Sequence, residues 1–324
     1  MSTPTATRRD LYQHVTDAIV TQLEAGTVPW RRPWDPTVGQ PRNAFTSRPY
    51  SGINSVLLGL EPYNDPRWGT YKQIAEHGGQ VRKGEHGSLV VFYKPIDKRP
   101  SGDDDTTAAT EKNERRRYLL LKSYTVFNTT QADGLDLPDL DTATVDRVEP
   151  LAAADAVLTG YNNPPSVRHN STSATYNPAA DAVATPPIEA FKSAEAFYLC
   201  LWHELAHSSG HPDRLNRPDL TAGRFGDRAY AREELTAEVT SAMIAARTGI
   251  VAPDIENTAA YIAGWLTALH DDTHLVVIAA GRAQKAADHI LGVSEDGELM
   301  APTHQHRSTA ASFGHEPKAG VATE

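Results

Sequence analysis

The stretch FYLCLWHELAHSSG, residues 197–210, decides how the rest of the chain is interpreted. Its apolar residues recur at helical spacing, and Gly210 stands where a C-terminal cap is expected. His203 and His207 are four residues apart, which places both rings on one side of a helix, about 6 Å apart along its axis. Both can therefore bind one Zn²⁺ ion, with Glu204 beside the metal as the acceptor of a proton from bound water. The pattern predicts a zinc-binding helix.

A third ligand is expected from a second helix, within residues 230–248. Glu234 and Glu238 are four residues apart there and share one face. In glutamate-ligated zinc peptidases, an acid of a second helix binds the metal and an acid one turn later orients a ligand histidine. Glu234 fits the first role and Glu238 the second. Glu233 is expected to point elsewhere, into solvent.

Alternatives to this ligand set stay open. Asp213 would complete the pattern H-E-x-x-H-x-x-G-x-x-D as the third ligand, and His211, directly after the cap glycine, is a less favoured candidate. The metal itself has two possible roles, which are hydrolysis of a peptide bond and a structural or blocked zinc site. A helix with two solvated histidines and no metal is the competing interpretation.

Length and composition limit the class of protein. The 324 residues exceed one ordinary core and suggest two domains, and 40% hydrophobic with 22% charged residues is typical of a soluble globular protein. A single cysteine, Cys200, excludes an internal disulfide and a multi-cysteine zinc site. No stretch of 18 apolar residues predicts a membrane span, and residues 1–10 lack the apolar core of a secretory signal. We therefore expect a cytoplasmic location and no membrane partner.

Charge is divided unevenly along the chain. Residues 1–130 hold 18 Lys and Arg against 14 Asp and Glu, whereas residues 131–324 hold 13 against 27. The formal net charge of −10 thus conceals a first part at +4 and a second part at −14. Such an asymmetry indicates that the first part meets an anionic partner.

Aromatic and basic side chains alternate in that first part. Aromatic rings can stack on unpaired bases while cations follow the phosphates, which is how single-stranded nucleic acid is held without reading its sequence. The alternative is that Trp30, Trp34 and Trp68 are core residues of a small domain. We expect contact with single-stranded DNA from Trp30, Arg31, Arg32, Trp34, Arg42, Phe45, Arg48, Tyr50, Trp68, Tyr71, Lys72, Arg82 and Lys83.

Periodicity and turn residues predict an α+β fold in two domains. A small α+β domain over residues 8–132, with a disordered acidic loop at 100–114, is followed by a linker at 133–150. A mainly helical domain with a short sheet covers 151–291, and 292–324 is a disordered tail. Helices are expected at 11–25, 54–60, 71–77, 152–160, 193–209, 230–248, 256–270 and 272–291, a hairpin at 81–94, a strand at 118–127 and short strands within 166–186.

The order of several motifs resembles a known family. In the first part these are YSGIN (50–54), WGTYKQ (68–73), GQVRKG (79–84) and VFN (126–128). In the second they are HELAHSSGH (203–211), RLNR (214–217), EELTAE (233–238) and AAGRAQKAA (279–287). Over about residues 8–291, this series is similar to the ArdC-type antirestriction proteins of conjugative plasmids and phages. The chain departs from them in its acidic insertion at 103–105 and in AVATP (182–186), where relatives have larger apolar residues.

The resemblance implies an N-terminal single-stranded-DNA-binding domain, a C-terminal zincin-like metallopeptidase domain, and protection of transferred DNA from host restriction enzymes. A protein substrate is a further expected partner. The runner-up hypothesis is a dedicated zinc metallopeptidase whose first domain selects protein substrates. A polynucleotide-processing enzyme is disfavoured, because the basic part has no nuclease-type cluster of carboxylates.

Overall fold

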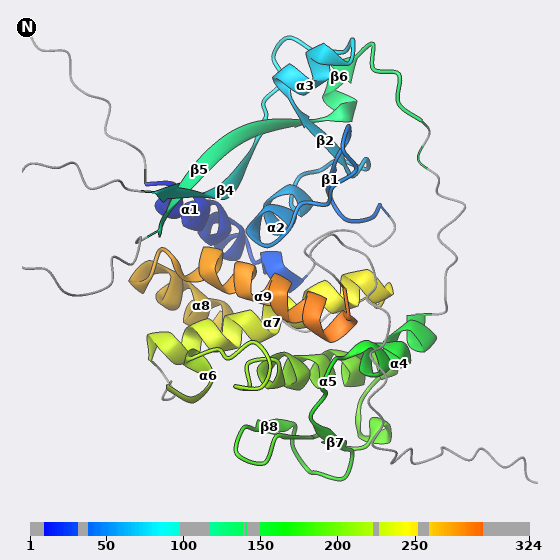
Figure 1. Ribbon diagram of the computed structural model, residues 1–324, viewed down its shortest axis with the longest axis vertical. Coiled ribbons are helices and arrows are strands. Elements are labelled where there is room, and N and C mark those ends of the chain that lie inside the picture. Colours follow the sequence, from blue (N-terminus) through cyan, green and yellow to red (C-terminus); the bar gives the residue numbers. More distant parts are fainter. Residues whose placement is uncertain are drawn as a thin grey trace, which may run out of the picture.

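A computed structural model describes residues 10–31, 38–97, 117–138, 140, 150–222, 227–251 and 259–293. The predicted acidic loop, most of the predicted linker and nearly all of the predicted tail lie outside these residues. Figure 1 shows a sheet with short helices in the upper part, a layer of longer helices below it, and a small sheet beneath those helices. The α+β fold class predicted from the sequence is confirmed.

The upper part is built on a four-stranded sheet with the order β1-β2-β5-β4. Its strands are β1 (Arg42–Asn43), β2 (Arg67–Thr70), β5 (Arg117–Asn128) and β4 (Ser88–Asp97). The pair β1–β2 is parallel, and the other pairs are antiparallel. The helices that accompany this sheet are α1 (Leu11–Glu24), α2 (Ile53–Gly59) and α3 (Tyr71–Glu76), with the 3-10 helices η1 (Pro29–Arg31) and η2 (Thr129–Gln131).

The hairpin predicted over residues 81–94 is wrong. β3 (Gln80–Val81) pairs with β6 (Ala132–Asp133), whereas β4 pairs with β5 along ten residues. The Gly84–Gly87 stretch therefore connects strands of two different sheets. Pairing with β5 provides hydrogen-bond partners for far more backbone groups of β4 than pairing with the two-residue β3 could. This difference explains why β4 pairs with β5.

The lower part is a helical layer. Its long helices are α5 (Ala194–Ser208), α7 (Arg228–Thr248) and α9 (Leu275–Leu291), and its others are α4 (Pro150–Gly160), α6 (Asp219–Ala222) and α8 (Ala259–Asp271). α7 ends at Gly249, whose φ of 77° is a left-handed cap that favours glycine. Beneath α5, β7 (Ser166–Arg168), β9 (Ala182–Ala184) and β8 (Thr175–Asn177) form a sheet in that order, which leaves β8 at the edge. The 3-10 helix η3 (Ile188–Ala190) leads into α5.

One apolar core runs through both parts. Ile19 and Leu23 of α1 and Trp30 of η1 belong to the same buried cluster as Trp202 of α5 and Ile244 of α7. A smaller cluster around Trp68 and Val126 lies within the upper sheet. Helix α1 and the 3-10 helix η1 are thus packed onto the helical layer. Among the described residues, no helix is long and apolar enough to cross a membrane.

Candidate metal centre and nucleic-acid surface

Two packed helices present the candidate metal ligands. Ser193 caps the N-terminus of α5, because its hydroxyl accepts a hydrogen bond from the backbone N–H of Ala196. The helix buries Trp202 and Leu205. Asp227 caps α7 in the same way, and this helix buries Leu235. These buried faces fix the rotation of each helix and leave the histidines of α5 facing the acids of α7.

His203, His207 and Glu234 converge on one point. The two Nε2 atoms are 3.2 Å apart, and the Glu234 carboxylate oxygens lie 3.6 Å from His203 Nε2 and 3.8 Å from His207 Nε2. Among the described residues, these three form the group of His, Cys, Asp and Glu side chains that could hold a metal. Metal–ligand bonds of about 2.1 Å in a tetrahedral site place ligand atoms about 3.4 Å apart. The observed separations fit such a site.

Glu204 lies at the same cleft, which is lined by His203, Glu204, His207, Tyr230 and Glu234 of the helices and by Thr175 and Tyr176 of β8. Burial raises the pKa of Glu204, and the nearby Glu234 carboxylate adds to this, although both histidines oppose it. The backbone of Tyr176 hydrogen-bonds the Glu204 carboxylate. A carboxylate with a raised pKa is a stronger base than an ordinary glutamate toward a proton of a nearby water.

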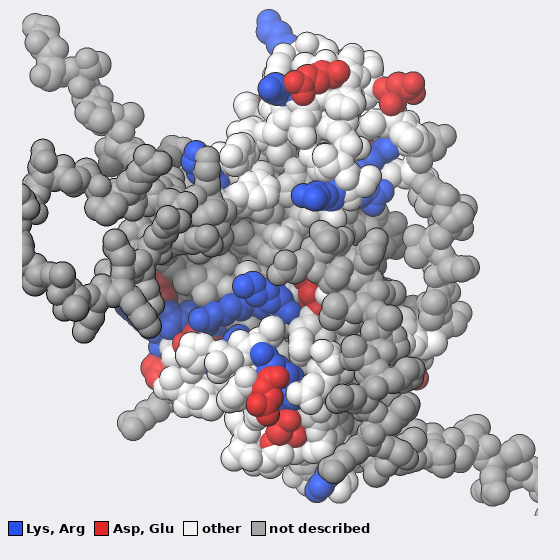
Figure 2. Space-filling view, viewed as in Figure 1, with Lys and Arg blue, Asp and Glu red and all other residues white. Residues whose placement is uncertain are grey.

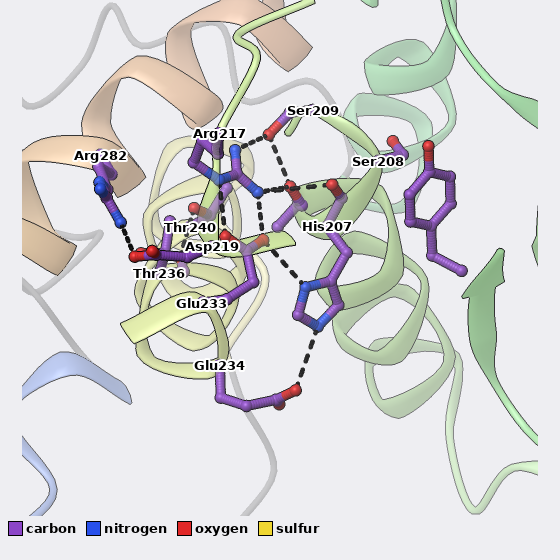
Figure 3. Close-up of polar contacts among 12 residues, drawn as sticks. His207, Ser208, Ser209, Arg217, Asp219, Glu233, Glu234, Thr236, Thr240 and Arg282 are labelled. Carbon is purple, nitrogen blue, oxygen red and sulfur yellow. Dashed lines mark hydrogen bonds and ion pairs between the residues drawn. The ribbon is translucent and has the colours of Figure 1, made fainter. Parts of the chain in front are cut away.

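Glu233 is buried at 4% exposure, so the expectation that it is solvated is wrong. Its Oε1 lies 3.2 Å from His207 Nδ1, and both its oxygens accept hydrogen bonds from the guanidinium of Arg217, at 2.5 and 2.9 Å. Burial by itself raises the pKa of Glu233, but Arg217 and His207 outweigh burial and lower it to about 2. Figure 3 shows Glu233 between His207 and Arg217, with Glu234 approaching the other side of the His207 ring.

Arg217 is anchored at the end of α5. It donates to the Ser209 hydroxyl at 2.6 Å and to the Ala206 carbonyl at 2.7 Å. A Cβ atom on Gly210 would lie 2.9 Å from the guanidinium, so a larger residue there would displace Arg217 from this position. Sequence reasoning missed Arg217 and Glu233. The signal that could have indicated Arg217 is the order of Gly210 and RLNR (214–217) shortly after the HELAH pentapeptide.

The other predicted members of the centre lie around it. Glu238 is half-buried. Burial by itself lowers the pKa of His203, but the hydrogen bond with Glu234 and the charges of Glu238 and its neighbours outweigh burial and raise it. Asp213 is far more exposed, with 76% of its side chain accessible, and it pairs with His211 at 3.6 Å. Neither Asp213 nor His211 belongs to the converging group. The geometry favours Glu234 over both.

Three of the aromatic rings predicted to contact DNA are buried, which corrects that prediction. Trp30 and Trp68 are each 1% exposed and Tyr50 is 8% exposed. Trp30 packs edge-on against Trp265 of α8, and Trp68 does so against Tyr63. A ring enclosed in this way cannot stack on a base, because its faces already contact protein. Trp30 and Trp68 are therefore core residues, as the alternative interpretation expected. Arg32 and Trp34 lie outside the described residues.

Other members of the predicted set are partly engaged. Arg31 lies over the ring of Tyr261 at 4.7 Å, Phe45 stacks on His77 at 4.1 Å between ring centroids, and Arg42 is half-buried. Arg48 is exposed. The structure brings Tyr71, Arg82 and Lys83 together around one hollow of the upper part, where Arg82 pairs with Glu85 and Asp133. Lys72 is exposed nearby in α3 and pairs with Glu76.

An exposed aromatic pair was missed by sequence reasoning. Phe92 of β4 and Tyr124 of β5 are 44% and 48% exposed, and their centroids are 5.6 Å apart. Tyr71 is 51% exposed. The strand alternation around positions 90–92 and 121–126 could have indicated which rings face outward, had the pairing of β4 with β5 been known. On the face drawn in Figure 2, Lys and Arg atoms also gather in a band at the level of α9, below the sheet.

Comparisons with known proteins match both parts of the chain. Residues 9–127 match the model of the N-terminal domain of the anti-restriction factor ArdC, and residues 152–282 match a zincin-like metallopeptidase. Crystal structures of the antirestriction protein ArdC from the R388 plasmid are similar, at 40% identity over 87% of this chain and 97% of that one. The TM-score is 0.66 for its metal-free form and 0.65 for its Mn(II)-bound form.

Two further relatives are similar over nearly the whole chain. An uncharacterised protein, y4eC, of Sinorhizobium fredii (strain NBRC 101917 / NGR234) is 37% identical over 90% of this chain and 95% of its own length. The DNA primase TraC of Escherichia coli is 35% identical over 92% of this chain, which spans only 28% of that protein.

Proposed function

Because the chain belongs to the ArdC antirestriction family, we propose that it binds single-stranded DNA and protects transferred DNA from restriction, and that it carries a zinc-dependent peptidase centre. The convergence of His203, His207 and Glu234 carries the second half of this proposal. Two imidazoles and one carboxylate are the donor set of catalytic zinc peptidase sites. A divalent metal is consistent with the Mn(II)-bound form of the R388 protein. Zinc itself is the proposal.

Each residue of the centre has a distinct role. His203, His207 and Glu234 would hold the metal, which would supply Lewis-acid chemistry toward a water and an amide carbonyl. Glu204 would take up a proton from the attacking water and return it to the leaving amine, a role that its raised pKa supports. Glu238 and Glu233 orient His203 and His207 respectively.

The edge strand β8 supports a polypeptide as the substrate. Strand β8 lies at the open edge of its sheet, and its residues Thr175 and Tyr176 line the cleft that holds Glu204. An extended peptide can add to such an edge through main-chain hydrogen bonds, which passes its carbonyl groups over the metal centre. Tyr230, which hydrogen-bonds Glu234, also lines this cleft.

The metal assignment is tested by zinc content of the purified chain. We expect about one zinc per chain, lost in His203→Ala and in Glu234→Ala and retained in Glu204→Gln. Asp213→Ala is the matched control, because Asp213 is an exposed acid near the same helix end. Full zinc in Glu234→Ala together with loss in Asp213→Ala would transfer the third position to Asp213.

The DNA surface is proposed on the exposed members of the upper part. Phe92, Tyr124 and Tyr71 offer rings for stacking, while Arg48, Lys72, Arg82 and Lys83 supply positive charge. Binding of an oligonucleotide should weaken steeply as salt rises, because phosphate contacts release counterions. Phe92→Ala with Tyr124→Ala should cost about 1–3 kcal/mol for each stacked base.

Fluorescence anisotropy with labelled single-stranded and duplex oligonucleotides measures both effects. The matched control is Phe191→Ala, which removes a half-buried ring in the lower part of the chain. Equal affinity of the double variant and the parent would remove the pair from the DNA surface, and tighter binding of duplex would contradict the single-strand proposal.

The dedicated peptidase remains the second candidate, since the open cleft at β8 fits a protein substrate. The two candidates differ in how protection depends on Glu204. Coating of a strand needs only stacking and charge, so protection of DNA from a restriction enzyme should survive Glu204→Gln and fail in the double variant of Phe92 and Tyr124. Loss of protection in Glu204→Gln with unchanged DNA binding would favour the peptidase.

A further inference from the structure

A second pocket adjoins the candidate metal centre, between α7 and α8. Its volume is about 490 Å³. Tyr230 and Glu234 line both this pocket and the metal cleft, so the two hollows share one wall. Its apolar lining comes from Ala231 of α7, from Tyr261, Gly264, Trp265 and Ala268 of α8, and from Leu275. A pocket of this size can enclose a large side chain.

The aromatic wall of the pocket is held from behind by the first part of the chain. The ring of Trp30 meets Trp265 edge-on, with centroids 5.5 Å apart and planes at 81°. The guanidinium of Arg31 covers the ring of Tyr261 at 4.7 Å. Because Trp30 is itself buried in the core shared by both parts, Trp265 rests on a fixed support. The pocket is therefore a preformed feature of the fold.

The charges around the pocket limit its occupant. Asp227, Asp271 and Asp272 also line it, Glu238 lies along the α7 side, and Arg228 adds one positive charge. The carboxylates outnumber this arginine, so the pocket disfavours an acidic side chain, which would add a further like charge at short range. The aromatic and aliphatic walls favour a side chain that gives up apolar surface to them.

We propose that this pocket binds a large apolar side chain of a polypeptide substrate, next to the bond that faces the metal centre. The inference rests on the proposed function of that centre. The shared residues Tyr230 and Glu234 place the mouth of the pocket beside the metal ligands, so a chain extended along the cleft can insert one side chain here. The pocket thereby sets which peptide sequences the centre accepts.

Gly264 provides a way to fill the pocket without disturbing the fold. A Cβ atom added at this position meets no other atom within 4 Å, and the backbone is helical. Gly264→Leu therefore fills open space, and Gly264→Ala is the matched control, because alanine and leucine have similar helix propensity. Neither variant alters a metal ligand.

The test uses peptide hydroxamates, which bind a metal directly, that carry a phenylalanine, glycine or glutamate side chain. Calorimetric titration of the zinc-loaded full chain should show the phenylalanine compound binding about 10- to 100-fold more tightly than the glycine compound. The glutamate compound should bind more weakly than the glycine compound. Gly264→Ala should keep this preference, and Gly264→Leu should abolish it with unchanged zinc content.

Two contrary outcomes are distinguishable. If the phenylalanine and glycine compounds bind the parent chain equally, or if Gly264→Leu keeps the preference, the pocket is not the side-chain site, although the metal centre stands. If no hydroxamate binds the zinc-loaded chain, the proposed centre fails and this inference fails with it.

Discussion

At the scale of single residues, the candidate metal centre adjoins a buried ion pair that the HELAH pentapeptide does not contain. Glu233 and Arg217 are each about 5% exposed, and Glu233 connects Arg217 to Nδ1 of His207. This contact favours the tautomer of His207 that carries its proton on Nδ1 and presents a free Nε2 toward Glu234 and His203. Arg217 therefore positions the candidate ligand His207 through one residue, Glu233.

Glu233→Gln should weaken zinc binding by about 10- to 100-fold, because the oriented charge behind His207 is lost. It should also destabilise the fold by about 3–5 kcal/mol, since Arg217 remains buried without its partner. Competition with a chelator measures the affinity, and urea unfolding measures the stability. Glu189→Gln is the control, as Glu189 is exposed.

A double variant separates positioning from stability. Arg217→Met with Glu233→Leu removes both buried charges, so most of the stability should return. The zinc affinity should stay low, because nothing then orients His207. Recovery of affinity along with stability would mean that the pair acts only through the fold.

The sequence could predict the two histidines of the candidate centre, but not Glu233 and Arg217, which hold His207 in place. A spacing of four fixes two side chains on one helix face, whereas the adjacent acids Glu233 and Glu234 differ only in rotation about the helix axis. Which of them faces the ligands and which faces Arg217 depends on how α7 packs against α5. That packing is set by contacts between residues distant in sequence, so the role of Glu233 was assigned wrongly while Glu234 was placed at the centre.

At the scale of elements, Asp219 joins three helices. It begins α6 and accepts hydrogen bonds from Arg232 of α7 at 2.9 Å and from Arg282 of α9 at 2.5 Å. Burial by itself raises the pKa of Asp219, but the two arginines outweigh burial and lower it. Because α7 carries Glu234 and α6 borders the cleft, this junction holds one wall of the candidate centre.

Asp219→Asn should destabilise the chain by about 2–3 kcal/mol at neutral pH, because Arg232 and Arg282 then lose their negatively charged hydrogen-bond acceptor. The folded-state pKa of Asp219 is lower than its unfolded value, so this stabilisation is present above about pH 4 and is lost as pH falls through the folded pKa. Urea unfolding of both proteins between pH 7 and pH 3 should show the gap closing toward acid. A gap that stays constant over that range would contradict the role of the charge.

The helices could be predicted because their signals, apolar periodicity and capping residues, lie within the helix itself. The strand pairing was predicted wrongly, because the true partner of β4 is distant in sequence. The predicted helices at 11–25 and 193–209 differ from α1 and α5 by one residue at an end or at both ends. The predicted hairpin failed because the true partner of β4 begins 20 residues after β4 ends, at Arg117. Turn residues at Gly84–Gly87 indicate a change of direction, but they carry no information on which strands then meet.

At the scale of the whole molecule, the two family matches share one core. The length of the chain, its periodicity and its turn residues favoured two separate domains joined by a linker at 133–150. Helix α1 and Trp30, however, pack into the cluster that contains α5, α7 and α9. Composition could not predict this arrangement, because an amphipathic helix is compatible with any apolar surface that covers it.

Trp30→Ala should therefore weaken both parts of the molecule together. Trp30 is 1% exposed and packs against Trp265 of α8, so removal of its ring should lower the free energy of unfolding by about 3–5 kcal/mol. Hydrogen exchange should speed up in parallel for the most protected amides of β5 and of α7, because the opening that exposes one exposes the shared core.

Leu151→Ala, at an exposed leucine, is the control. It should leave the free energy of opening of both sets of amides within about 0.5 kcal/mol of the parent. Faster exchange confined to β5 would mean that the upper part opens on its own, and the two matched regions would then be independent units despite their common cluster.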